Sequence, residues 1–166
     1  MVSPRLTKGR HSQIGHVYSI TTVARGRRRL FADHDSARII ASEMKVADGR
    51  GLTASLAWVL MPDHLHWLFQ LESGSLSTLI QQFKAGTAQS INQTQQRRGS
   101  VWQAGFHGHC VRDERSLGKI ARYLLENPIR AGLVSDIADY PYWWCAWQVE
   151  GDLQAAVGAE RAADRV

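Results

Sequence analysis

The chain has 166 residues, of which 44% are hydrophobic and 21% are charged, as is typical of one soluble globular domain. Twenty Lys and Arg against fifteen Asp and Glu give a net charge of +5, which favours a polyanionic partner. Two cysteines without a CxxC pair exclude a disulfide framework, and the longest purely apolar run, residues 56–61, is too short to span a membrane. No apolar stretch follows the basic N-terminus, so we expect no secretory signal and a cytoplasmic location.

The positive charge is concentrated near the N-terminus, where seven basic residues precede the first acidic one, Asp33. Such an arm is typical of a phosphate-binding segment, although a solvated basic tail would have the same composition. The Ala-rich end of the chain is expected to fray. Residues 1–150 are therefore interpreted as one domain with a basic N-terminal arm, and residues 151–166 as a tail.

The first half of the domain is predicted to contain three strands and a helix. Residues 16–23 are rich in β-branched and aromatic types and indicate a strand. A helix is expected over residues 36–48, with Asp33 and Asp35 as candidate N-caps. Residues 54–61 and 64–71 follow as strands that should pair antiparallel across a tight turn. The first of these two is apolar on both faces, which predicts a central position in the sheet.

The second half adds a long helix, a strand and a further helix. The long helix is expected from about Ser75 to Arg98, the strand over residues 106–112, and the last helix over residues 114–126, where Pro128 closes it. The order β-α-β-β-α-β-α predicts an α+β, ferredoxin-like fold, with a split βαβ antiparallel sheet and an added C-terminal helix. This fold hosts many functions, so it decides none of them.

Two histidines, His64 and His66, flank Leu65 on the strand at 64–71. Side chains at i and i+2 lie on the same face of a strand, roughly 6.5–7 Å apart at the backbone, so two imidazoles can bind one divalent ion. A lone histidine there would more often be a satisfied core residue, but a spaced pair favours a metal site. Two histidines with oxygen ligands suit Mn or Mg acting on phosphate, and also Zn.

Tyr123 lies off the apolar stripe of the last helix, in line with Lys119 four residues before it and Asn127 four residues after it. A phenol can attack phosphorus if a metal polarises the phosphate. The amide oxygen of Asn127 would then complete the metal site, and Lys119 or Arg130 would neutralise phosphate. Without the histidine pair, the same pattern would favour a boundary tyrosine and a capping asparagine.

Two segments carry a family resemblance: VLMPDHLHWLF, and the helix with Tyr123 and Asn127 followed by NPIRAGLV. Together they resemble the single-tyrosine transposases of the HUH superfamily, particularly the REP-associated tyrosine transposases of bacteria. The resemblance covers residues 14 to 148 and includes GHVYSITTVARGRRRLF and WQAGFHGHCVR. The combination is specific, whereas a single His-x-His motif would be weak.

The resemblance implies that His64 and His66 bind Mg or Mn and that Asn127 supplies a third ligand. Tyr123 would attack the scissile phosphodiester and become joined to the 5′ phosphate. The implied substrate is single-stranded DNA flanking an imperfect hairpin, such as a repetitive extragenic palindrome, which would be nicked and rejoined without ATP. The resemblance leaves open whether Tyr123 acts with the histidines of its own chain or with those of the second chain in a homodimer. Phosphate contacts are expected from a set of basic residues: Arg25, Arg27, Arg28, Arg29, Lys119 and Arg130.

Two alternatives remain at this point. One is a non-cleaving nucleic-acid-binding regulator of the same fold. The other is a zinc site that draws on a second His-x-His pair and a neighbouring thiol, comprising His64, His66, His109 and Cys110. His107 and His109 receive no catalytic role, and their part in DNA contact is left open.

Four tryptophans and one phenylalanine are expected either to stack on bases or to pack in the core. Trp102 and Phe106 are candidates for stacking on unpaired bases. The bulk and clustering of Trp143, Trp144 and Trp147 favour core packing.

Overall fold

The computed structural model describes residues 12–147. All seven helices and strands predicted from the sequence are present, and three short 3-10 helices also occur within these residues. In chain order they are β1 (Val17–Val23), η1 (Arg25–Arg27), α1 (His34–Gly49), β2 (Thr53–Met61), β3 (His64–Leu71), α2 (Leu76–Thr94), β4 (His107–Val111), η2 (Glu114–Ser116), α3 (Leu117–Leu125), α4 (Asn127–Arg130), η3 (Ile137–Asp139) and β5 (Trp143–Cys145). The first part of the basic arm and the predicted tail at 151–166 lie outside the described residues.

The five strands of the described residues form one antiparallel sheet in the order β4-β1-β3-β2-β5. The first four strands have the order of a split βαβ unit, so the ferredoxin-like prediction is confirmed. The fifth strand was not predicted. It pairs with β2 over three residues, and the side chain of Trp143 is fully buried there, as expected of a core residue.

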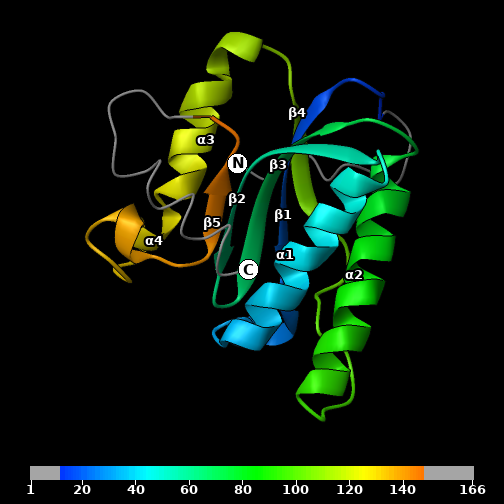
Figure 1. Cartoon of the computed structure of the whole chain (residues 1–166), viewed down its shortest axis with the longest axis vertical. Coiled ribbons are helices and arrows are strands. Elements are labelled where there is room, and N and C mark those ends of the chain that lie inside the picture. The colour runs from blue at the N-terminus through cyan, green and yellow to red at the C-terminus, as the bar shows by residue number, and fades with distance from the viewer. Residues whose placement is uncertain (1–11, 148–166) are drawn as a thin grey trace.

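Helices cover the two faces of the sheet unequally (Figure 1). α1 and α2 lie side by side on one face, where Ile40, Met44 and Phe83 pack against Leu65 and Trp67 of β3. α3 covers the β2 and β5 half of the opposite face. Its buried side chains belong to a second core that also includes residues of β2, β3 and β5: Ala57, Val59, Met61, Leu68, Ala121, Leu124, Leu125 and Trp143.

Capping fixes where the two long helices begin. Asp33 accepts a hydrogen bond from the Ser36 backbone N–H, which confirms it as the N-cap of α1, and Ser75 caps α2 through Thr78 in the same way. α2 ends at Thr94, earlier than predicted, and the chain turns at Gln96, whose φ of 49° is not helical.

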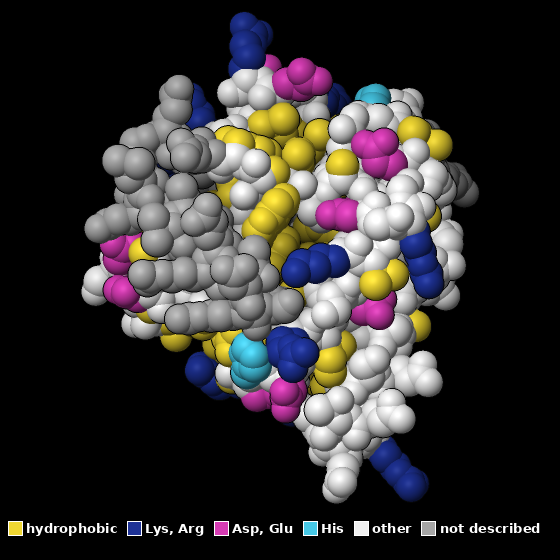
Figure 2. All heavy atoms as spheres, in the orientation of Figure 1, with side chains coloured by type: hydrophobic (Ala, Val, Ile, Leu, Met, Phe, Trp, Pro, Cys, Tyr) yellow, Lys and Arg dark blue, Asp and Glu magenta, His cyan; other side chains and the backbone are white. Residues whose placement is uncertain are grey.

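On the face that carries α1 and α2, acidic and basic side chains of the described residues are interspersed (Figure 2).

Trp102 is part of the core, so the prediction that it stacks on DNA bases is wrong. Only 7% of it is exposed, its indole N–H donates to Thr87 Oγ1 at 2.9 Å, and its ring centroid lies 4.6 Å from that of Phe31. Phe106 is partly buried against the same core. Within residues 12–147, no helix combines the length and apolar character needed to cross a bilayer.

Candidate metal and DNA site

The alternation of β3 decides which way the histidine pair faces. Leu65 and Trp67 point into the core beneath α1 and α2. His64 and His66 therefore point to the opposite face, as does Leu68, which packs in the core that includes α3. The prediction that the two histidines share one face is confirmed. α3, the helix that carries Tyr123, packs on the same face.

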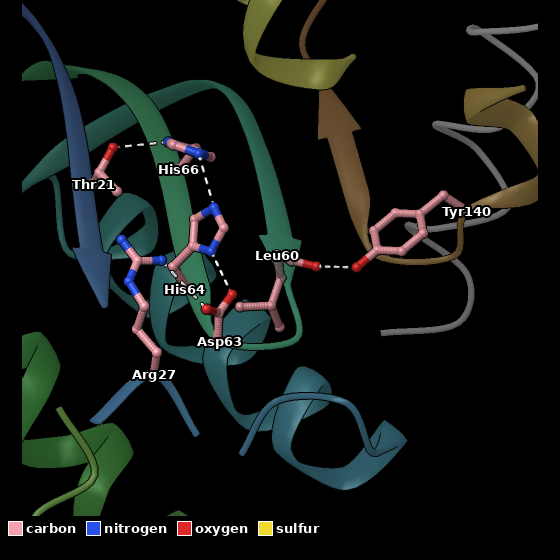
Figure 3. A network of polar contacts seen from close by, with 7 residues as sticks. All are labelled: Thr21, Arg27, Leu60, Asp63, His64, His66 and Tyr140. Atoms are coloured by element: carbon pink, nitrogen blue, oxygen red, sulfur yellow. Dashed lines mark hydrogen bonds and ion pairs between the residues drawn. The ribbon is translucent and has the colours of Figure 1, made fainter. Parts of the chain in front are cut away.

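The two imidazoles converge (Figure 3). His64 Nε2 and His66 Nε2 lie 3.1 Å apart, and each ring is fixed through its other nitrogen. His64 Nδ1 lies 2.6 Å from Asp63 Oδ1, and His66 Nδ1 lies 2.8 Å from Thr21 Oγ1. Two ligand atoms at about 2.1 Å from one octahedral ion, at a right angle, would be about 3.0 Å apart. The separation of the two Nε2 atoms thus fits a pair of neighbouring ligands on one metal.

The electrostatics of the site favour the protonation states that bind cations. Burial, the neighbouring His64 and the charge of Arg130 lower the pKa of His66 to about 4, so its imidazole is neutral near pH 7. Burial alone would raise the pKa of Asp63. The hydrogen bond and charge of His64, together with Arg27, outweigh burial and lower that pKa, so the carboxylate stays ionised.

The turn between β2 and β3 joins the histidines to the arginine segment. The Ala24 N–H donates to Asp63 O at 2.8 Å, and the Phe31 N–H donates to Pro62 O at 3.0 Å, which anchors both ends of residues 24–31 to the turn. Arg27 then places its Nη1 3.4 Å from Asp63 Oδ2 (Figure 3). The sequence predicted this arginine as a DNA contact, but its position beside the carboxylate that orients His64 could not be read from the sequence.

The other three arginines of the segment are exposed around the same turn. Arg25 Nη1 lies 3.4 Å from Ser100 Oγ, and Arg28 Nε lies 3.4 Å from the Arg25 carbonyl oxygen. Arg29 is exposed as well. Because residues 24–31 are tied to the turn at Asp63, these charges lie at the end of the sheet where the histidines sit.

The helix that carries Tyr123 is shorter than predicted. α3 ends at Leu125, and Asn127 begins the separate helix α4, so the prediction of one helical column through Lys119, Tyr123 and Asn127 is wrong. Lys119 and Tyr123 do share α3, and both are exposed. The Asn127 Nδ2 donates to Leu124 O at 2.8 Å, which caps α3. That bond uses the amide nitrogen, whereas a metal would bind the amide oxygen.

Arg130 connects the tyrosine to the histidine pair. Its guanidinium carbon lies 3.9 Å from the centroid of the Tyr123 ring, and its charge helps to lower the pKa of His66. α3 itself packs on the sheet face that carries the histidines. Among residues 12–147, the Tyr123 phenol makes no hydrogen bond to either imidazole, and the tyrosine is 67% exposed.

The second histidine pair lies on the same face of the sheet but on an edge strand. His107 pairs with Thr21, and His109 with Ser19. Cys110 pairs with Tyr18 on the opposite face, where it packs against the core beneath α1 and α2. A zinc site that combines His109 with Cys110 is therefore wrong, and no cluster of three His, Cys, Asp or Glu suited to a metal occurs within the described part of the chain.

Two residues that orient the histidines were missed by the sequence reasoning. Asp63 directly precedes His64 in the turn, so its position in the sequence could have predicted that it contacts the His64 ring. Thr21 stands 45 positions from its partner, and only the pairing register of β1 with β3 reveals that it lies opposite His66. Such partners fix the tautomer and orientation of metal-binding imidazoles.

Comparisons with known proteins point in the same direction as the geometry. A family profile described as "Transposase IS200 like" matches residues 12–127. A protein of Haemophilus influenzae described as a candidate REP-associated tyrosine transposase is 28% identical over 99 residues, which cover 53% of this chain and 56% of that protein. The REP-associated tyrosine transposase of Escherichia coli is 26% identical over 88 residues, which cover 52% of this chain and 50% of the relative. The chain thus spans about half the length of the curated relatives it matches.

A solved structure has the same fold. It is that of a REP-associated tyrosine transposase bound to a REP hairpin, and it superposes with a TM-score of 0.67 over 81% of this chain and 79% of that chain. The sequences are 20% identical. This likeness supports the architecture of the sheet and its helices.

Proposed function

The chain belongs to the IS200-like transposase family, and from that premise we propose that it is a metal-dependent single-strand DNA endonuclease and strand transferase. It acts at hairpin-forming repeats through a 5′-phosphotyrosine intermediate. The observation that carries the proposal is the convergence of the two Nε2 atoms at 3.1 Å, on the sheet face that also bears the tyrosine helix.

The metal would be held by His64 and His66, with the amide oxygen of Asn127 as a third ligand. Mg or Mn would supply Lewis-acid polarisation of the scissile phosphate. Asp63 and Thr21 fix the two rings through their Nδ1 atoms, so both Nε2 atoms are presented together. Because the lowered pKa of His66 keeps that ring neutral, metal binding would release no net proton from it near pH 7.

Tyr123 is the proposed nucleophile. Its phenolic oxygen forms a bond to phosphorus as the bond from phosphorus to the 3′ oxygen breaks, and the phenol loses a proton while the leaving 3′ oxygen gains one. The product is a 5′-phosphotyrosine and a free 3′ hydroxyl. Attack by a 3′ hydroxyl reverses the step, so the energy of the phosphodiester is conserved and rejoining needs no ATP.

The proposed DNA contacts surround this site. Arg25, Arg27, Arg28 and Arg29 lie in the segment after β1 that is hydrogen-bonded to the turn between β2 and β3. Lys119 lies on α3 and Arg130 on α4. A hairpin substrate is proposed because the solved structure of the same fold is bound to a REP hairpin. We further propose that Tyr123 acts with the histidines of its own chain, since Arg130 contacts its ring and acts electrostatically on His66.

The test is formation of a covalent adduct between the protein and a single-stranded oligonucleotide that contains a palindromic hairpin with flanking bases. Oligonucleotides are chosen from repeats near the gene. Wild-type protein with Mg or Mn should give a band of increased mass that resists denaturant, and chelator, Tyr123→Phe or His66→Ala should abolish it. No adduct from the wild type, or an equal yield from Tyr123→Phe, would refute the proposal.

Two variants of this assay address the alternatives. Tight hairpin binding that chelator does not change, without any adduct, would identify a non-cleaving regulator. Mixing Tyr123→Phe with His66→Ala protein should give no adduct if each chain uses its own histidines. Recovery of the adduct in the mixture would instead show a homodimer with shared sites.

A further inference from the structure

A break in the chain after α3 brings Arg130 back over Tyr123. Pro128 has no N–H, so Leu124 O cannot receive the helical hydrogen bond that the next turn would supply. α3 ends at Leu125, and side chains satisfy two of its last carbonyl oxygens. Asn127 Nδ2 donates to Leu124 O at 2.8 Å, and Arg130 Nη2 donates to Tyr123 O at 2.7 Å.

Three contacts hold the guanidinium of Arg130 in place. It stacks over the Tyr123 ring at 3.9 Å, it donates to the carbonyl oxygen of the same residue, and its Nη1 lies 3.7 Å from Glu126 Oε2. Its side chain is only 37% exposed, whereas that of Arg115 on η2 is 93% exposed. The planar guanidinium can stack and donate hydrogen bonds at once, which the ammonium of a lysine cannot do.

Tyr123 is 67% exposed, so packing within residues 12–147 holds little of its ring. Tyr123 projects from the exposed side of α3, away from Ala121, Leu124 and Leu125, which are the buried residues of that helix. An exposed ring exchanges between rotamers on the picosecond to nanosecond timescale. An attacking oxygen must instead be held in line with the bond it displaces.

We propose that Arg130 is a positioning residue that clamps the Tyr123 ring in its attacking orientation, in addition to any contact it makes with DNA. This inference rests on the proposed function. It separates Arg130 from the other arginines of the site, whose part is phosphate binding. The clamp acts on the rate of attack within the bound complex, whereas a phosphate contact acts on affinity.

The test is single-turnover adduct formation at saturating hairpin DNA for wild type, Arg130→Gln and Arg130→Lys. Arg115→Gln, which removes the same charge from an exposed site, is the control. The clamp predicts a rate constant at saturating DNA about ten- to a hundredfold lower in both Arg130 variants, while Arg130→Lys, which keeps the charge, should retain a dissociation constant within about threefold of wild type. Arg115→Gln should keep the wild-type rate. A weakened affinity with an unchanged rate at saturation, or full rescue by lysine, would overturn the clamp and leave only a phosphate contact.

A second measurement is independent of catalysis. The protons on Arg130 Cδ should show a ring-current shift in NMR spectra, and this shift should disappear in Tyr123→Leu while persisting in Arg115→Gln. If the wild type forms no adduct, the proposed function fails, yet the ring-current shift still reports the clamp. Absence of the shift in a folded wild type would refute the clamp whatever the activity.

Discussion

Replacing His66 by glutamine should flatten the pH dependence of stability in the metal-free protein. The pKa of His66 is lowered from 6.5 to about 4, by burial first and then by His64 and Arg130. Between these values the unfolded chain binds a proton that the folded protein excludes, so stability falls as the pH falls through 6.5 and levels off below about 4. Integration from pH 8 to pH 5 gives a loss of about 2 kcal/mol from this residue.

The assay is urea unfolding at pH 8 and pH 5 in the presence of chelator, with the free energy of unfolding extrapolated to water. The wild type should lose about 2 kcal/mol more than His66→Gln between the two pH values. His107→Gln, which removes an exposed histidine of the same sheet face, should keep the wild-type difference. Equal losses in wild type and His66→Gln would refute the view that the fold holds His66 neutral.

Three further outcomes are expected. Asp63→Asn should weaken Mn binding, measured by titration calorimetry, by about 10- to 100-fold because His64 loses the carboxylate that orients it, and an unchanged affinity would contradict this role. Trp143→Ala should cost about 3–5 kcal/mol in urea unfolding, since its fully buried ring joins β5 to the second core; a loss below 1 kcal/mol would show that β5 is peripheral. The double substitution of Arg25 and Arg28 by glutamine should reduce the slope of log affinity for single-stranded DNA against log salt by about 1.4, and an unchanged slope would remove these two arginines from the DNA contact.

The sheet and the direction of the histidines were predictable because a strand has a period of two. Once Leu65 is assigned to the core, His64 and His66 must share the other face. The same rule placed His107 and His109 together on β4. Nothing in a single strand could show that Cys110 faces away from the first pair, because that depends on the pairing of β4 with β1.

Predictions failed where side chains, and not the backbone period, decide the structure. Trp102 lies just after the helix-breaking Gly99-Ser100 pair and Val101, yet its ring is buried and its indole N–H donates to Thr87 Oγ1 in the core. The short strand β5 has only three residues, so its alternation is too brief to recognise. Asp63 could be linked to His64 by its adjacency, whereas Thr21 could be linked to His66 only through the register of β1 with β3.

The end of α3 shows how one residue can shape both the fold and the proposed chemistry. Had the helix continued through residue 128, the Asn127 N–H would have taken the carbonyl oxygen of Tyr123, and the amide side chain and the guanidinium would have had no helix end to satisfy. Pro128 prevents that continuation. The side chains of Asn127 and Arg130 therefore donate hydrogen bonds to carbonyl oxygens in the last turn of α3. The break places the amide of Asn127 on the Leu124 carbonyl oxygen and the guanidinium of Arg130 on Tyr123. An alanine at position 128 should therefore extend α3, release Arg130 from the ring and slow DNA attack even if the helix becomes more stable.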